Sequence, residues 1–167
     1  KGYAQRSSNE WPGVGISVPA WLSDYSNGLM IEHNANLFRW MHITPQKQDI
    51  ESCDRVGVIQ MLPAGDAEKD VEGRRWEQRK ELMRDVIIYT RNNPSILFYE
   101  CGNESISREH MIEMIAIRDQ YDPHGGRAIG SREMLDIREA EYGGEMLYIN
   151  KSEHHPMIHT EYFRDEG

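Results

Sequence analysis

Two glutamates, Glu104 and Glu161, each follow a short apolar run that is typical of a buried strand. The first run, residues 94–101, starts at a proline and leads into Gly-Asn-Glu-Ser, and the second, residues 156–160, leads into Glu-Tyr. Folds with parallel strands place their chemistry at the carboxyl ends of those strands. A carboxylate beside an amide, as in Asn103-Glu104, is therefore a candidate acid for bond cleavage. The alternative is that Glu104 simply caps the helix that follows.

A third polar strand end lies near the start of the chain. Residues 36–45 form an apolar run that breaks into polar residues before Pro45, and the run contains Arg39 and His42. Polar residues at the end of a buried strand lie where folds with parallel strands place their chemistry. The alternative is structural, with the arginine in a salt bridge and the histidine hydrogen-bonded in the core.

The elements that must position these residues alternate along the chain. Strands are expected over 1–5, 36–45, 58–62, 94–101, 127–131, 145–149 and 156–162, and helices over 17–34, 46–56, 77–89 and 107–121. Ser17 and Ser107 are candidate N-caps, and Gly57 is expected to end the second helix. The charged stretch 66–75 is expected to be a solvated surface. Alternation of this kind predicts βαβ units and a parallel sheet.

Composition narrows the class of protein. The chain has 167 residues, 38% of them hydrophobic and 28% charged, which is typical of a soluble globular domain. Its net charge of −9 argues against nucleic acid as a partner, since nucleic-acid binding requires a basic face. No apolar run approaches the ~20 residues that cross a bilayer, so no membrane partner is expected. Cys53 and Cys101 lack metal-ligand spacing and are expected to be reduced, buried thiols.

Three segments, taken in order, resemble glycoside hydrolase family 2, which includes β-galactosidases, β-glucuronidases and β-mannosidases. Asn93-Pro94-Ser95-Ile96 followed by Gly102-Asn103-Glu104 resembles the family's acid/base segment. Asn36, Arg39 and His42 fit the Asn-x-x-Arg-x-x-His at the end of its second barrel strand. Residues 156–162 resemble its seventh strand, whose glutamate is the nucleophile.

The resemblance implies an α/β fold, the (β/α)8 TIM barrel. About seven of its eight strands are present, so the barrel is expected to be incomplete; a compact barrel variant is the alternative. Residues 1–167 would then be the catalytic barrel domain of a larger multidomain enzyme, with accessory β-sandwich domains elsewhere in the parent chain. Export to the periplasm or the cell exterior is expected by analogy with polysaccharide-degrading relatives.

The resemblance also implies roles for individual residues. Glu104 would be the acid/base and Glu161 the nucleophile of a retaining mechanism, which places the two carboxyl groups about 5–5.5 Å apart. Substrate-binding roles would fall to Asn103, which holds the sugar 2-hydroxyl, and to Arg39, His42, Tyr162 and Trp76. His159 and Tyr162 are candidates for supporting contacts behind the catalytic groups. Trp76 has an alternative role as the first buried residue of the next helix. No cofactor and no metal are implied.

The substrate is expected to be a carbohydrate with a β-linkage. Within the resemblance, the Ser105 that follows Asn103-Glu104 favours a β-galactosidase-like activity over that of a β-glucuronidase, and β-glucuronidase and β-mannosidase are the alternatives in the same family. Two rival functions remain open. One is a metal-dependent hydrolase built on His154, His155, His159 and Glu161, although no HExxH framework exists. The other is a non-catalytic carbohydrate-binding barrel, which has no need of two opposed carboxylates.

Overall fold

The computed structural model describes residues 1–5, 11–15, 17–64, 69–104, 106–132, 137–145 and 156–160. Its strands form one parallel sheet in chain order, β1 to β7. The strands are β1 (Gly2–Gln5), β2 (Leu37–Trp40), β3 (Ile59–Pro63), β4 (Ile96–Glu100), β5 (Ala128–Arg132), β6 (Tyr142–Glu145) and β7 (Met157–His159). The helices are α1 (Ala20–Glu32), α2 (Lys47–Val56), α3 (Arg74–Thr90) and α4 (Arg108–Tyr121).

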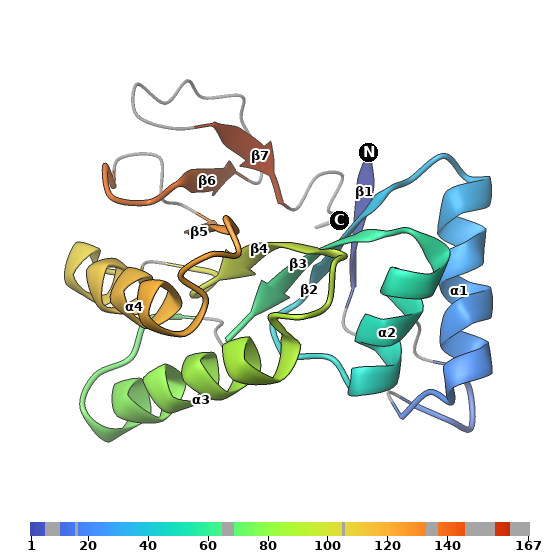
Figure 1. Cartoon of the computed structure of the whole chain (residues 1–167), viewed down its shortest axis with the longest axis horizontal. Coiled ribbons are helices and arrows are strands. Elements are labelled where there is room, and N and C mark those ends of the chain that lie inside the picture. Colours follow the sequence, from blue (N-terminus) through green and yellow to red (C-terminus); the bar gives the residue numbers. More distant parts are fainter. Residues whose placement is uncertain are drawn as a thin grey trace, which may run out of the picture.

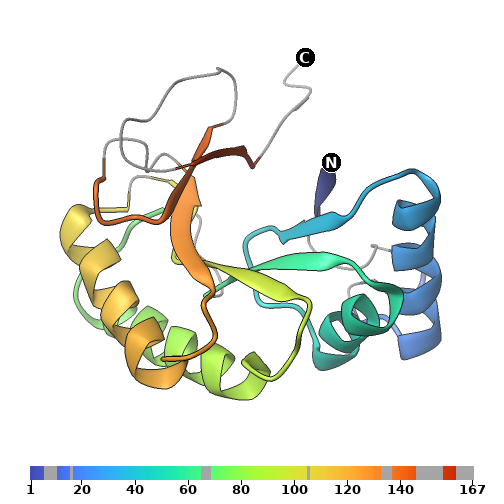
Figure 2. The same cartoon turned by 45° about the horizontal axis from the view of Figure 1, so that its top comes forward.

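The sheet is curled, and the four helices cover its outer side (Figures 1 and 2). The strands β1 and β7 are its two edges, and Figure 2 shows them facing each other across the open side. Seven parallel strands with helices outside are an incomplete TIM barrel, as the sequence predicts. The carboxyl ends of all seven strands therefore lie at one end of the sheet.

Local signals in the sequence explain where the helices begin and end. The Ser107 hydroxyl accepts a hydrogen bond from the His110 backbone N–H, so Ser107 is the N-cap of α4. Gly57 ends α2 with a φ of 89°, a left-handed conformation that favours glycine. Pro19 immediately precedes α1 and has no N–H to leave unsatisfied there. These boundaries agree with the prediction to within a few residues.

The two faces of the sheet carry different residues. Phe38 and Trp40 stack on each other in β2, with ring centroids 4.0 Å apart, and belong to the apolar core shared with the helices. Arg39 lies between them in sequence and must point to the other face, because side chains alternate along a strand. Glu100 of β4 is reached by the Arg39 side chain, so both belong to the inner face of the barrel. The inner face is thus polar at the carboxyl ends of the strands.

The sixth strand begins earlier than the sequence predicts. β6 spans Tyr142–Glu145, whereas the strand was expected over 145–149, of which residues 146–149 lie outside the described residues. Two consecutive glycines inside it, Gly143 and Gly144, remove the alternation by which a strand is recognised. Gly130 lets β5 and β6 approach each other closely, because a Cβ at this position would be only 2.2 Å from the Tyr142 carbonyl oxygen.

The two cysteines are buried free thiols, as predicted. Burial raises the pKa of both Cys53 and Cys101 well above the usual range, so neither is a reactive thiolate at neutral pH. Among the described residues, no helix is long and apolar enough to span a bilayer.

Candidate active site

Arg39, Glu100 and Asn103 form a buried cluster at the carboxyl ends of β2 and β4. The Arg39 Nε and Nη2 atoms donate to Glu100 Oε2 and Oε1, each over 2.7 Å. Arg39 Nη2 also donates to Asn103 Oδ1 over 2.8 Å. The three residues are almost completely buried, so the charges of Arg39 and Glu100 neutralise each other in a site with little water. The cluster brings together two of the predicted site residues, Arg39 and Asn103.

Glu104 lies next to this cluster and faces a second arginine. The Arg132 Nη2 atom donates to Glu104 Oε1, and Arg132 itself lies at the carboxyl end of β5 and is buried. The Lys69 Nζ atom is 4.0 Å from Glu104 Oε2. A quarter of the Glu104 side chain remains exposed, in contrast to Glu100. Glu104 therefore has a fixed charge partner in Arg132 and is also accessible from solvent.

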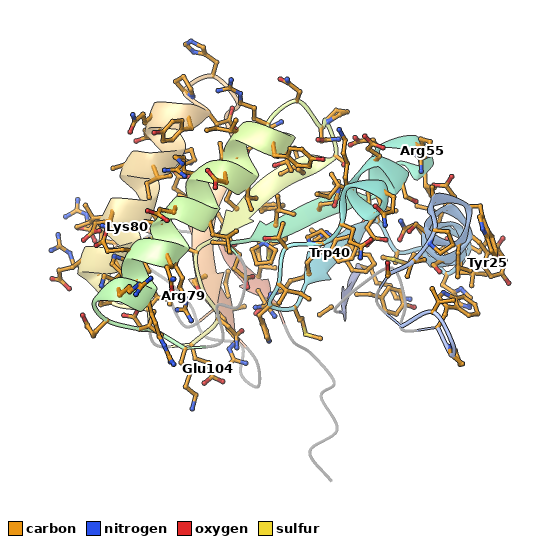
Figure 3. All side chains as sticks on the ribbon, turned by 90° about the horizontal axis from the view of Figure 1, so that it is seen from below. Tyr25, Trp40, Arg55, Arg79, Lys80 and Glu104 are labelled. Atoms are coloured by element: carbon orange, nitrogen blue, oxygen red, sulfur yellow. The ribbon has the colours of Figure 1, made fainter. Side chains whose placement is uncertain are left out.

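In the view of Figure 3, Glu104 and Arg79 of α3 lie on the same side of the molecule, well away from Tyr25 of α1. Arg79 Nη1 donates to the carbonyl oxygen of Lys69. The β3–α3 connection, from Lys69 onward, therefore passes beside Glu104 and is fastened to α3.

The prediction that Glu104 merely caps the next helix is wrong. The N-cap of α4 is Ser107, whose hydroxyl accepts from the His110 N–H. The carboxylate of Asp70 accepts a further N–H at this helix terminus, that of Ser107, over 3.0 Å. The Glu104 carboxylate instead points to Arg132. A helix-capping role therefore does not explain why Glu104 lies at the strand end.

Asp70 also belongs to this region, although the sequence did not indicate a role for it. Its carboxylate accepts hydrogen bonds from Ser107 N, from Val71 N (2.9 Å) and from His110 Nδ1 (2.7 Å). Burial alone would raise the pKa of Asp70, but the hydrogen bonds from His110, Ser107 and Val71 outweigh it and hold that pKa below its usual value. The expectation that residues 66–75 form a solvated surface is therefore wrong for Asp70; residues 65–68 lie outside the described residues.

Trp76 has its alternative role, that of a buried residue at the start of the next helix. It lies in the first turn of α3 and is 3% exposed. Its indole stacks on the His110 imidazole with centroids 3.7 Å apart, and its Nε1 donates to Glu113 Oε2 over 3.1 Å. Protein groups thus cover the ring that the sugar-stacking prediction requires to be open.

The remaining predicted residues follow the ends of β2 and β7. His42 lies two positions beyond the end of β2 and is partly buried. The strand β7 ends at His159, two positions before Glu161, and pairs in parallel with β6. Glu161 and Tyr162 lie outside the described residues, as does the side chain of His159. Their predicted roles remain predictions.

Sequence reasoning missed Glu100 and Arg132, the partners of Arg39 and Glu104. Glu100 ends an otherwise apolar strand, Ile-Leu-Phe-Tyr-Glu, and a charged residue inside a buried run is itself a signal that an opposite charge must lie nearby. Arg132 directly follows the strand expected over 127–131, but it opens a charged stretch without a clear period, and no motif indicated that it pairs with Glu104.

The metal-dependent alternative relies on His154 and His155, which lie outside the described residues, and on His159 and Glu161. Within the part of the chain that the structure describes, no three histidine, cysteine, aspartate or glutamate side chains are grouped to hold a metal ion.

Comparison with known proteins places this geometry in context. Residues 1–167 match the family described as glycosyl hydrolases family 2, TIM barrel domain. A β-glucuronidase from Formosa agariphila is 32% identical over 172 residues, which cover 99% of this chain and 17% of the relative. The solved structure of a family 2 β-glucuronidase superposes with a TM-score of 0.84 at 30% identity, over 93% of this chain and 17% of that one.

A second solved structure shares the fold alone. A β-galacturonidase from Eisenbergiella tayi, solved with galacturonate, has a TM-score of 0.77 at 19% identity. The superposition covers 93% of this chain and 34% of the galacturonidase chain. The chain thus spans about a sixth of the length of the curated relative, whose remainder contains residues with no counterpart here. Both relatives described above at 30% identity or more are named β-glucuronidases, the alternative to the β-galactosidase-like activity that the sequence favoured.

Proposed function

Because this chain belongs to glycosyl hydrolase family 2, we propose that it forms the catalytic barrel of a retaining β-glycosidase. The match to the family covers residues 1–167. The observation that carries the proposal is the placement of Glu104: it follows β4, its carboxylate is held by Arg132, and part of it is open to solvent. Helix capping does not account for this placement, since Ser107 caps α4.

The proposed reaction has two displacement steps. In the first, Glu104 protonates the glycosidic oxygen while the Glu161 carboxylate attacks the anomeric carbon, so that the aglycone leaves as an alcohol and a glycosyl ester forms. In the second, the Glu104 carboxylate removes a proton from water, which attacks the same carbon and releases Glu161. Two inversions give net retention, and both carboxyl groups return to their starting states.

Asn103 and Arg39 are proposed to orient the sugar. Asn103 Oδ1 accepts a hydrogen bond from Arg39 Nη2. The Asn103 amide nitrogen can then donate to a substrate hydroxyl. Two hydrogen bonds to Glu100 hold the Nε and Nη2 edge of the Arg39 guanidinium, so this orientation is set before substrate binds. His42 and Tyr162 are proposed to complete the pocket. Arg132 holds the acid/base carboxylate between the two chemical steps.

The substrate is proposed to be a β-glucuronide. Both relatives described above at 30% identity or more are β-glucuronidases by name, which supports a glucuronide over the galactoside that Gly-Asn-Glu-Ser favoured. The chain is about a sixth of the curated relative's length, so accessory domains, including β-sandwiches, are proposed for the protein that carries it. A comparison of 4-nitrophenyl β-glucuronide, β-galactoside and β-mannoside as substrates decides between the three activities.

The roles of the two glutamates are tested by chemical rescue of the protein that carries this chain. With azide present, Glu104→Ala is expected to regain turnover and give a glycosyl azide of retained configuration. Glu161→Ala is expected to give the inverted azide, because azide then replaces the nucleophile itself. Wild-type-like activity of either variant without azide would overturn the assignment.

A further inference from the structure

The segment Lys69–Val71 runs beside Glu104 as if it were a short extra strand. Lys69 and Glu104 form a parallel β-bridge, and the Asp70 N–H donates to the Glu104 carbonyl oxygen over 3.2 Å. The backbone that carries the Glu104 side chain is thus hydrogen-bonded to a neighbouring connection, not only to its own strand.

The side chain of Asp70 holds the other end of the same stretch. Its carboxylate accepts from Ser107 N over 3.0 Å and from His110 Nδ1 over 2.7 Å, both at the start of α4. Only two residues, 105 and 106, separate Glu104 from Ser107 in the sequence. One residue therefore fixes both ends of the four-residue connection that carries Glu104 from β4 into α4.

Rigid elements hold Asp70 in turn. The His110 ring that donates to Asp70 is stacked on Trp76, whose Nε1 is bonded to Glu113 of α4. Arg79 of α3 donates to the Lys69 carbonyl, the residue before Asp70. Asp70 is thus anchored to two helices, and Val71 packs against the apolar core.

We propose that Asp70 is a positioning residue that holds Glu104 in place for proton transfer, an inference that rests on the proposed acid/base role of Glu104. Asp70 acts through the Glu104 backbone and touches no reacting atom. A substitution that removes its carboxylate keeps the Asp70 N–H bond to the Glu104 carbonyl but releases Ser107 and His110, so that Glu104 loses the support of a fixed neighbour at the start of α4. A displacement of about 1 Å at an acid/base group can cost on the order of 10²-fold in rate.

The test measures kcat/KM of the protein that carries this chain on two aryl β-glucuronides. Dinitrophenolate leaves without protonation, whereas phenolate requires it, so only the phenyl substrate depends on a well-placed acid. Asp70→Ala is expected to lower kcat/KM about 10–100-fold on the phenyl substrate and less than about threefold on the dinitrophenyl substrate. Asp70→Asn keeps only one of the two oxygens, so it can retain the hydrogen bond from Ser107 or the one from Val71 but not both, and its loss on the phenyl substrate should be smaller than that of Asp70→Ala.

Two variants separate this role from a general loss of structure. Ser107→Ala removes the cap of α4 but leaves Asp70 in place, and Asp24→Ala removes a carboxylate that pairs with Arg55 on the surface. Neither should change the ratio between the two substrates. An unchanged ratio in Asp70→Ala, or an equal change in Ser107→Ala, would overturn the inference. Where Asp70→Ala does not fold, Asp70→Asn decides by the same criterion.

The same assay distinguishes failure of the inference from failure of the proposed function. Glu104→Gln should lower the phenyl rate far more than the dinitrophenyl rate. A selective loss in Glu104→Gln without one in the Asp70 variants refutes the role of Asp70 alone. The absence of a selective loss in Glu104→Gln refutes the acid/base assignment, and the role of Asp70 with it.

Discussion

The Arg39 guanidinium and the Glu100 carboxylate form two parallel hydrogen bonds of 2.7 Å although β3 lies between their strands. The pair therefore crosses the inner face of the barrel beneath Asn103. Both side chains are buried, and a paired geometry of this kind offsets the cost of removing two charges from water. The same pair orients Asn103 and links β2 to β4.

Glu100→Gln is expected to lower the free energy of unfolding by about 3–5 kcal/mol, because it leaves the Arg39 charge buried without a carboxylate. Urea denaturation at neutral pH measures the change. The matched control is Asp24→Asn, which breaks the surface pair between Asp24 and Arg55. The side chain of Arg55 is 46% exposed and that of Asp24 is 39% exposed. The control should cost less than about 1 kcal/mol. Equal changes in the free energy of unfolding would show that the buried pair contributes no more to stability than the exposed pair.

Ser107→Ala and Glu104→Gln should separate helix capping from catalysis. Removal of the Ser107 hydroxyl is expected to cost about 0.5–2 kcal/mol of stability with little change in kcat. Glu104→Gln should do the reverse, because its carboxylate contacts Arg132 and not the helix terminus. Thermal melts and kinetics on the same preparations give both quantities. A large stability loss in Glu104→Gln with normal kcat would return Glu104 to a structural role.

Trp76→Ala is expected to destabilise the protein by about 3–5 kcal/mol, since it empties the contact between α3 and α4. Trp76→Phe keeps an aromatic ring on His110 and loses only the hydrogen bond to Glu113, so about 0.5–1.5 kcal/mol is expected. KM for an aryl glycoside should not change in the phenylalanine variant. A raised KM at unchanged stability would instead support the sugar-stacking role.

Acid is expected to weaken the contribution of Asp70 to stability. Its folded pKa lies below the value of about 3.9 in an unfolded chain, because hydrogen bonds to the ionised form outweigh burial. The stabilisation is therefore fully present above about pH 4 and is lost as the pH falls through the folded pKa. The difference in unfolding free energy between wild type and Asp70→Asn should shrink from pH 6 to pH 3. A constant difference over that range would contradict this ionisation.

The fold was predictable because its signals are local. Helix ends at Gly57 and Ser107 depend on residues within one turn, and the apolar runs of β3 and β4 identify buried strands from a few positions. Arg39 and Asn103, to which the resemblance gave substrate-binding roles, do meet in the structure, because the carboxyl ends of parallel strands lie at one end of the sheet. The early start of β6 escaped prediction because Gly143 and Gly144 carry no side chains that reveal a period.

The partners of the candidate site were less predictable because they are set by packing between distant segments. Glu100 is 61 positions from Arg39, and no local pattern indicates which charge compensates a carboxylate at a strand end. Asp70 lies in a charged loop, and its composition resembles that of an exposed surface. Only the folded connection brings its amide to Glu104 and its carboxylate to Ser107.

The most direct test of the central claim is the distance between the Glu104 and Glu161 carboxyl groups in a crystal structure of the protein that carries this chain. A retaining mechanism predicts about 5–5.5 Å, with both groups at the carboxyl ends of parallel strands. A distance of about 6.5–9.5 Å would indicate an inverting enzyme and contradict the proposed double displacement. Carboxyl groups on opposite faces of the barrel would refute a shared catalytic role altogether.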